Sequence, residues 1–145
     1  MRSFSLALVV LCCMLLGSQA AASDADVLRQ FGMLGRIAVD CNAPHSRDNP
    51  HVIYFASPKG RLTRTLNRAR DRDGTFPMRN LRLLTPNLLQ YVEISRGFEK
   101  TITVAKVDGK FRFWRSVQVD GTVLIADGKF PKTGAPTLLF EKCAN

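Results

Sequence analysis

The sequence KTITVAKVDGKFRFWRSVQVDGTVLIA, residues 100–126, alternates runs of strand-forming residues with two Asp-Gly pairs. Asp-Gly favours the two-residue type I′ turn, because both central positions of that turn need a positive φ. Asp108-Gly109 and Asp120-Gly121 therefore predict two tight hairpins. The strands that they connect are expected at residues 100–107, 110–119 and 122–126.

The same pattern continues on both sides of this segment, where further strands are predicted at residues 34–41, 51–56, 62–66, 81–85, 88–95 and 137–142. Residues 42–50 and 67–75 are predicted to be loops. A short helix at residues 24–31 is expected before the strands, with Ser23 as its cap and Gly32 at its end. The fold class predicted is thus all-β, an antiparallel up-and-down meander of about eight or nine strands that forms a barrel or a sandwich.

The N-terminus has the pattern of a secretory signal peptide. Arg2 precedes an apolar run at residues 6–17 and the small residues at 18–22, and cleavage is expected after Ala20 or Ala22. A transmembrane helix needs about 20 apolar residues, so no transmembrane segment is expected in the mature chain. We therefore divide the chain into a cleaved signal peptide at residues 1–22 and a single β-barrel-like domain at residues 23–145, located in the bacterial periplasm or secreted.

Cleavage would leave two of the 4 cysteines, Cys41 and Cys143, near opposite ends of the mature chain. Disulfides form and persist in exported proteins, so we predict a bridge between them. It would close a loop of roughly 100 residues, which the chain-entropy model credits with about 4 to 5 kcal/mol of stability. A bridge from the first strand to the last favours a closed barrel, because closure brings these strands together.

The same bridge weakens the catalytic alternatives. Cys41 with His45 or His51 could form a nucleophile and base, and Asp40, Cys41, His45 and Asp48 could ligate a metal, but both arrangements need a free thiol. The chain contains no Gly-rich phosphate loop and no G-x-S-x-G elbow. We therefore expect a binding protein rather than an enzyme, with no catalytic residue, no metal and no cofactor.

The formal net charge of +9 is concentrated between residues 59 and 82. Arginine pairs in a bidentate way with phosphate and carboxylate groups, so this stretch is a candidate anion-binding patch. The alternative is a solvated strand and loop whose charges prevent edge pairing. Phe76 is the single aromatic residue available there for base stacking, so no nucleic-acid partner is expected. The candidate patch residues are Arg61, Arg64, Arg68, Arg70, Arg72, Arg79 and Arg82.

Alternate residues of the strand predicted at 110–119 share the face that we expect to point into the barrel: Phe111, Phe113, Arg115, Val117 and Val119. A buried Arg115 needs a partner, and Glu93 is the nearest candidate if Tyr91 and Leu89 also point inward. Two interpretations stay open. Arg115 could form a structural ion pair, or Arg115 and Tyr91 could meet the carboxylate or phosphate head of an apolar ligand.

Gly35-Arg36-Ile37 follows the predicted helix and opens the first predicted strand. Together with a single meander and a C-terminal Cys, this layout resembles the lipocalin or calycin family, in which a G-x-W motif opens the first strand. Ile37 stands here in place of the Trp. The segments DGKF (residues 127–130) and LFEKC (residues 139–143) are also similar to those of small exported proteins of alphaproteobacteria. The first resemblance implies a lipocalin-like barrel, and the second implies no activity.

Two functions are therefore considered. The first is a non-catalytic periplasmic or secreted binding protein for an apolar or amphiphilic anionic ligand, whose candidate ligand-binding residues are Arg115, Tyr91, Phe111, Phe113 and Glu93. The alternative is a basic protein that docks on anionic lipid, lipopolysaccharide or an acidic protein of the cell envelope through the stretch from Arg61 to Arg82.

Overall fold

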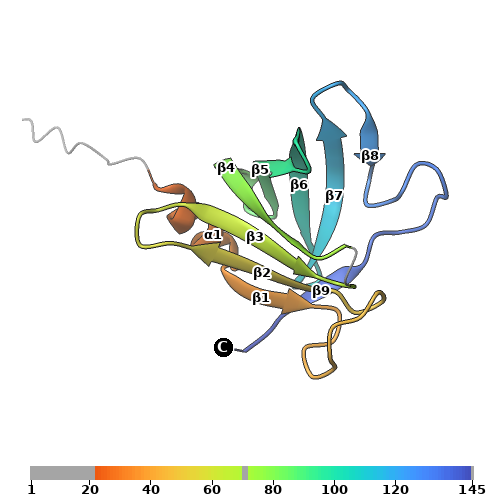
Figure 1. The fold of residues 1–145 in the computed structure, drawn as a ribbon, viewed down its shortest axis with the longest axis horizontal. Helices are drawn as coiled ribbons and strands as arrows, with labels where there is room; N and C mark the ends of the chain where they lie inside the picture. The colour runs from red at the N-terminus through yellow and green to blue at the C-terminus, as the bar shows by residue number, and fades with distance from the viewer. Residues whose placement is uncertain (1–21, 70–71, 145) are drawn as a thin grey trace, which may run out of the picture.

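The chain forms a closed antiparallel β-barrel in the computed structural model, which describes residues 22–69 and 72–144 (Figure 1). The predicted signal peptide at residues 1–22 lies outside the described residues except for Ala22, and it stays a prediction. The described residues form one helix, α1 (Asp24–Phe31), and nine strands: β1 (Gly35–Ala38), β2 (His51–Ala56), β3 (Leu62–Asn67), β4 (Gly74–Thr85), β5 (Leu88–Ser95), β6 (Phe98–Val107), β7 (Lys110–Gln118), β8 (Val123–Ile125) and β9 (Leu139–Lys142).

Neighbouring strands pair antiparallel in chain order from β1 to β7, so the sheet is an up-and-down meander. β9 pairs with both β1 and β7, which closes these strands into a barrel. The additional strand, β8, pairs with the second half of β7 at Ser116 and Val117. The predicted all-β meander is therefore confirmed, and of the two architectures considered it forms the barrel.

The two Asp-Gly turns differ from each other. Asp108 and Gly109 both have positive φ, 51° and 75°, as the predicted type I′ turn requires. At the second turn Gly121 has a φ of 87°, but Asp120 is not in the left-handed region. Gln118 donates its N–H to the carbonyl of Thr122 at 2.9 Å, so the loop has three residues with glycine in the last position. The two-residue turn predicted there is wrong, and β7 ends one residue earlier than expected.

β4 is the strand that the sequence described least well. A loop was expected at residues 67–75 and a strand at 81–85, whereas β4 begins at Gly74 and has 12 residues. Pro77 lies within it, opposite Thr63 of β3, but the pairing of β4 with β5 begins only at Met78. The missing N–H of Pro77 is tolerated because the strand is still an edge at that point.

Helix α1 covers one end of the barrel, which we call the closed end (Figure 1). The helix begins and ends as predicted, because Ser23 accepts a hydrogen bond from the N–H of Asp26 and Gly32 adopts a φ of 82°. Phe31 is buried and packs against Phe111 at the start of β7, with ring centroids 5.8 Å apart. The hydrophobic core therefore extends from the barrel into the helix.

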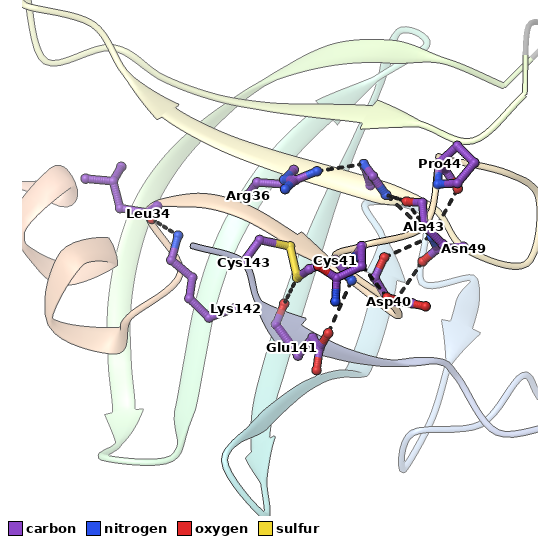
Figure 2. The surroundings of a disulfide bond; sticks show 12 residues. Leu34, Arg36, Asp40, Cys41, Ala43, Pro44, Asn49, Glu141, Lys142 and Cys143 are labelled. Atoms are coloured by element: carbon purple, nitrogen blue, oxygen red, sulfur yellow. Dashed lines mark hydrogen bonds between the residues drawn. A yellow bond between two sulfur atoms is a disulfide. The ribbon is translucent and has the colours of Figure 1, made fainter. Parts of the chain in front are cut away.

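The predicted disulfide joins Cys41, which follows β1, to Cys143, which follows β9 (Figure 2). Their Cα atoms are 5.4 Å apart, and 102 positions separate them in the sequence. Hydrogen bonds join the same two segments of the chain. Cys143 donates its N–H to the carbonyl of Arg36 at 3.0 Å. Cys41 donates its N–H to Oε1 of Glu141 at 3.2 Å. The bridge thus fastens the two strands whose pairing closes the barrel.

Candidate functional site

A cavity of about 360 Å³ lies at the end of the barrel opposite α1, which we call the open end. It forms where the wall of the barrel changes partners. β9 pairs with the beginning of β7, at Phe111 and Arg112, and β8 takes its place beside Ser116. Residues 126–138 then cross from β8 back to β9, so the cavity lies between this segment and the inner face of the sheet. Its apolar lining residues are Val52, Leu66, Ile102, Phe113, Ile125, Phe130, Leu138 and Phe140.

The predicted position of Arg115 in the interior is wrong, because β7 contains a bulge. Thr103 of β6 lies opposite Arg115 and the next residue, Val104, lies opposite Phe113, so Trp114 is an extra residue on β7. An extra residue reverses the alternation of side chains along a strand. Arg115 is therefore exposed, and Ser116 is buried and lines the cavity in its place. Val119, expected on the same inner face, is 78% exposed.

The buried arginine of this barrel is Arg64, on β3. It holds Glu93 of β5 in a bidentate ion pair, in which Nε donates to Oε2 and Nη2 donates to Oε1 at 2.9 Å. Nζ of Lys100, on β6, lies 3.1 Å from the same Oε1. We call these three residues the charge cluster. Two cations share one carboxylate, so the cluster carries one net positive charge inside the barrel.

The predicted ion-pair partner, Glu93, is thus a partner of a buried arginine, but of Arg64 rather than Arg115. Tyr91 and Leu89 point inward with it, as expected, and all three side chains are fully buried. The Tyr91 hydroxyl lies 3.4 Å from that of Tyr54, on the closed-end side of the ion pair along β5. Phe111 packs against α1, so among the predicted ligand-binding aromatics Phe113 lines the cavity and Phe111 lies deeper.

The protonation states of the cluster follow from its burial and its charges. Burial alone would raise the pKa of Glu93, but hydrogen bonding and charge from Arg64, with the charge of Lys100, lower that pKa below its usual value. Burial opposes the charge of Arg64, yet Glu93 raises the Arg64 pKa. Burial raises the pKa of Tyr54 to about 12, so its phenol is neutral at physiological pH. The ion pair of Glu93 and Arg64 is therefore charged on both sides at neutral pH.

Aromatic rings position the guanidinium of Arg64. Its Cζ atom lies 5.1 Å from the ring centroid of Phe76 and 5.9 Å from that of Phe113. Such contacts are attractive and restrict the side chain. A second hollow of about 730 Å³ shares Arg64, Arg68 and Lys100 with the cavity and adds two further basic residues, Arg72 and Arg96. The cationic side chains of the cluster, Arg64 and Lys100, therefore line both the cavity and this second, basic hollow.

The structure distributes the predicted arginine patch over several parts of the barrel. Arg64 is interior, and Arg68 and Arg72 line the second hollow. Arg61 precedes β3, at the closed end, and is exposed. Arg79 and Arg82 lie on the outer face of β4, where Arg79 pairs with Glu99 and Arg82 donates to Gln90. Arg70 lies outside the described residues. The described arginines between residues 61 and 82 therefore do not form one continuous surface.

Sequence reasoning overlooked Lys100 and Ser116 and misplaced Arg64 on the surface. A signal for Arg64 was present, because Leu62, Arg64 and Leu66 alternate onto one face of β3 and both leucines are apolar. Lys100 likewise shares a face with Ile102 and Val104 of β6. Ser116 had no such signal, since its position depends on the bulge at Trp114.

Three further findings concern a metal site, the Cys41 thiol and a membrane span. In residues 22–69 and 72–144, no group of three or more His, Cys, Asp or Glu side chains could hold a metal ion. The thiol of Cys41, which the catalytic alternative needs, is in the disulfide. Within the same described ranges, none of the helical segments has the length and apolar character required to cross a bilayer.

Comparisons of the chain with models of protein families, with curated proteins and with solved structures found no match.

Proposed function

We propose that this protein is a non-catalytic binding protein for an amphiphilic anion, a molecule with an apolar body and one carboxylate or phosphate head. The observation that carries the proposal is the mainly apolar cavity whose wall contains Arg64 and Lys100, two cations that share the single buried carboxylate of Glu93. Ligand sites typically combine a mainly apolar lining with a few charged groups that fix orientation.

The charge cluster suits an anionic head better than a neutral or cationic one. A buried charge is costly unless it is compensated, and here one positive charge exceeds the single carboxylate. The Lys100 side chain is 19% exposed and borders the cavity, so it can contact a ligand head while Arg64 stays paired with Glu93. An incoming carboxylate or phosphate would bring the interior to approximate neutrality.

The apolar body of the ligand would lie against the opposite part of the lining. Val52, Ile102 and Phe140 come from three strands of the barrel, and Phe130 and Leu138 come from the segment that crosses the open end. Exclusion of apolar surface from water would supply most of the affinity, at about 25 cal/mol per Å² buried. The head contact would then select among ligands of similar length.

The remaining predictions accompany this proposal. We infer a periplasmic or secreted location, which the disulfide supports because such bonds persist in oxidising compartments. We expect no catalysis and no cofactor. The likeness to the lipocalin layout stays a resemblance in the arrangement of strands and in the position of the cavity at one end.

The test compares four probes of equal chain length by calorimetric titration: dodecanoate, dodecyl phosphate, dodecanol and dodecylammonium, the three ionic probes below their micellar concentrations and dodecanol below its solubility limit. We expect the two anions to bind and the alcohol and the cation to bind at least about tenfold more weakly. Lys100→Gln should weaken dodecanoate by about tenfold. Lys110→Gln removes an exposed lysine at the closed end and serves as the matched control. Equal affinities for dodecanol and dodecanoate, or no binding of either anion, would overturn the proposal.

A further inference from the structure

Exposed apolar side chains gather at the open end of the barrel. Among the described residues, the large hydrophobic side chains that are exposed toward this end are Ile94, Phe98, Val119, Val123, Phe130 and Leu138. Phe55 and Leu84 are their counterparts toward the closed end. Phe98 is 60% exposed and Val119 is 78% exposed, so neither packs against the core.

The two most exposed of these side chains, Phe98 and Val119, lie at or beside turns at this end of the barrel. Phe98 follows the turn at Arg96-Gly97 between β5 and β6, and Val119 lies in the turn between β7 and β8. The two turns are adjacent, because the N–H of Val119 donates to the carbonyl of Glu99 at 3.0 Å. Figure 1 shows the turn after β7 and the segment after β8, which carries Phe130, on the side of the barrel away from α1.

Basic residues surround the same tips. Arg96 is in the turn beside Phe98, and Lys129 and Lys132 flank Phe130. Arg68 and Arg72 line the second hollow. Several acids nearby are engaged locally: Glu99 pairs with Arg79, Asp73 accepts from the N–H groups of Arg68 and Ala69, and Asp120 accepts from that of Thr122. Asp48 and Asp127 add two negative charges, so the described charges at this end remain positive in sum.

We propose that the open end docks on the surface of an anionic lipid bilayer, with Phe98, Val119 and Phe130 inserted among the head groups and the surrounding bases against lipid phosphates. Separate apolar tips interleaved with lysine and arginine suit a fluid, negatively charged interface, where apolar insertion and electrostatic attraction add. Docking would place the end of the barrel that contains the cavity at the bilayer. The proposal goes beyond ligand binding and does not depend on it, since the tips and the cavity are formed by different side chains apart from Phe130 and Leu138.

The experiment is sedimentation of the protein with vesicles of phosphatidylcholine alone or with about 30% phosphatidylglycerol. The full chain is produced, the exported protein is purified, and its N-terminus is read by mass spectrometry. We expect binding to the anionic vesicles, and a loss of that binding when salt rises from about 0.1 M to about 0.5 M. Failure to bind anionic vesicles, or equal binding to both compositions, would overturn the proposal.

Two pairs of variants place the contact at the open end. The double variant Phe98→Ser with Val119→Ser should weaken partitioning by at least about tenfold, whereas Phe55→Ser, exposed at the closed end, should not. Lys129→Gln with Lys132→Gln should weaken it by about tenfold or more, since each lysine near an anionic surface contributes about fivefold. Arg61→Gln, at the closed end, is the matched charge control. Equal losses in the controls would contradict docking by this end.

A gain of signal complements these losses. Phe98→Trp should shift its fluorescence to shorter wavelength and become accessible to bromine-labelled lipids when anionic vesicles are added, and Phe55→Trp should do neither. Size-exclusion chromatography with light scattering tests whether a second copy of the protein covers these apolar side chains instead. A dimer that the Phe98→Ser, Val119→Ser variant dissociates would assign these tips to self-association and overturn the proposal. Vesicle binding without binding of dodecanoate would contradict the proposed function alone.

Discussion

The two ends of this barrel are built from the same strands but contain different chemistry. At the closed end, Phe31 of α1 packs on Phe111, and Leu28 and Met33 are fully buried beside them. At the open end, the inward positions of β3, β5 and β6 carry Arg64, Glu93 and Lys100 around a cavity. Apolar packing at the closed end can therefore stabilise the fold while the open end keeps a charge cluster whose burial costs free energy.

The largest effect is expected from breaking the closed end. Phe31→Ala should lower the free energy of unfolding by about 3 to 5 kcal/mol, because the ring is buried and leaves a cavity. Phe55→Ala, which removes an exposed ring from β2, should change it by less than about 0.5 kcal/mol. Urea denaturation of both variants measures the difference. Similar stabilities for the two variants would mean that α1 does not close the core.

The charge cluster should respond differently from the packed end. Glu93→Gln leaves Arg64 and Lys100 without their carboxylate, so the free energy of unfolding should fall by about 3 kcal/mol. The same change raises the net interior charge by one, so dodecanoate should bind more tightly to the protein that remains folded. Urea denaturation measures the expected loss of stability, and calorimetric titration measures the expected gain in dodecanoate affinity. Unchanged stability with weaker dodecanoate binding would show that Glu93 itself contacts the ligand.

The disulfide links the ends of β1 and β9, the two strands whose pairing closes the barrel. Cys41→Ser with Cys143→Ser should lower the free energy of unfolding by about 2 to 4 kcal/mol, because the bridge closes a loop of 102 positions in the unfolded chain. Dodecanoate affinity should stay within about twofold at temperatures where the variant is folded, since neither cysteine lines the cavity. A larger loss of affinity would show that the disulfide helps to maintain the shape of the cavity.

A smaller effect is expected from pH. Folding lowers the pKa of Glu93, so the unfolded chain binds this proton more readily than the folded one. The resulting stability is fully present when the pH is above 4.5, the ordinary pKa of a glutamate. It is lost as the pH falls below that value toward the pKa of Glu93 in the folded protein. Urea midpoints between pH 7 and pH 3 should therefore fall more steeply in the unmodified protein than in Glu93→Gln. Parallel curves would contradict an ionised Glu93.

Alternation and turn chemistry were sufficient to predict most of the barrel. The caps Ser23 and Gly32 and the Asp108-Gly109 hairpin follow from local rules, the disulfide follows from the number of cysteines, and the structure has all of them. β4 was misjudged because the bases and Pro77 near its start are typical of loops. A strand is decided there by pairing with β3, which no local pattern reveals.

The candidate site was predicted less completely, for a physical reason. A single extra residue, Trp114, reverses the two faces of β7, so Arg115 and Ser116 exchange the positions that strict alternation assigns. A bulge is not encoded in the alternation that it interrupts. The kind of chemistry was nevertheless predicted, since a buried arginine paired with Glu93 is present, supplied by β3 instead of β7.

The most direct test is titration of dodecanoate into Ser116→Phe and Arg115→Gln, two neighbours on β7 that the bulge separates. Ser116 is buried and lines the cavity, so a phenyl ring there should fill it and weaken binding by at least about tenfold. Arg115 is exposed, so its change should leave the affinity within about twofold. Loss of binding in Arg115→Gln with retention in Ser116→Phe would contradict an anion site inside this barrel.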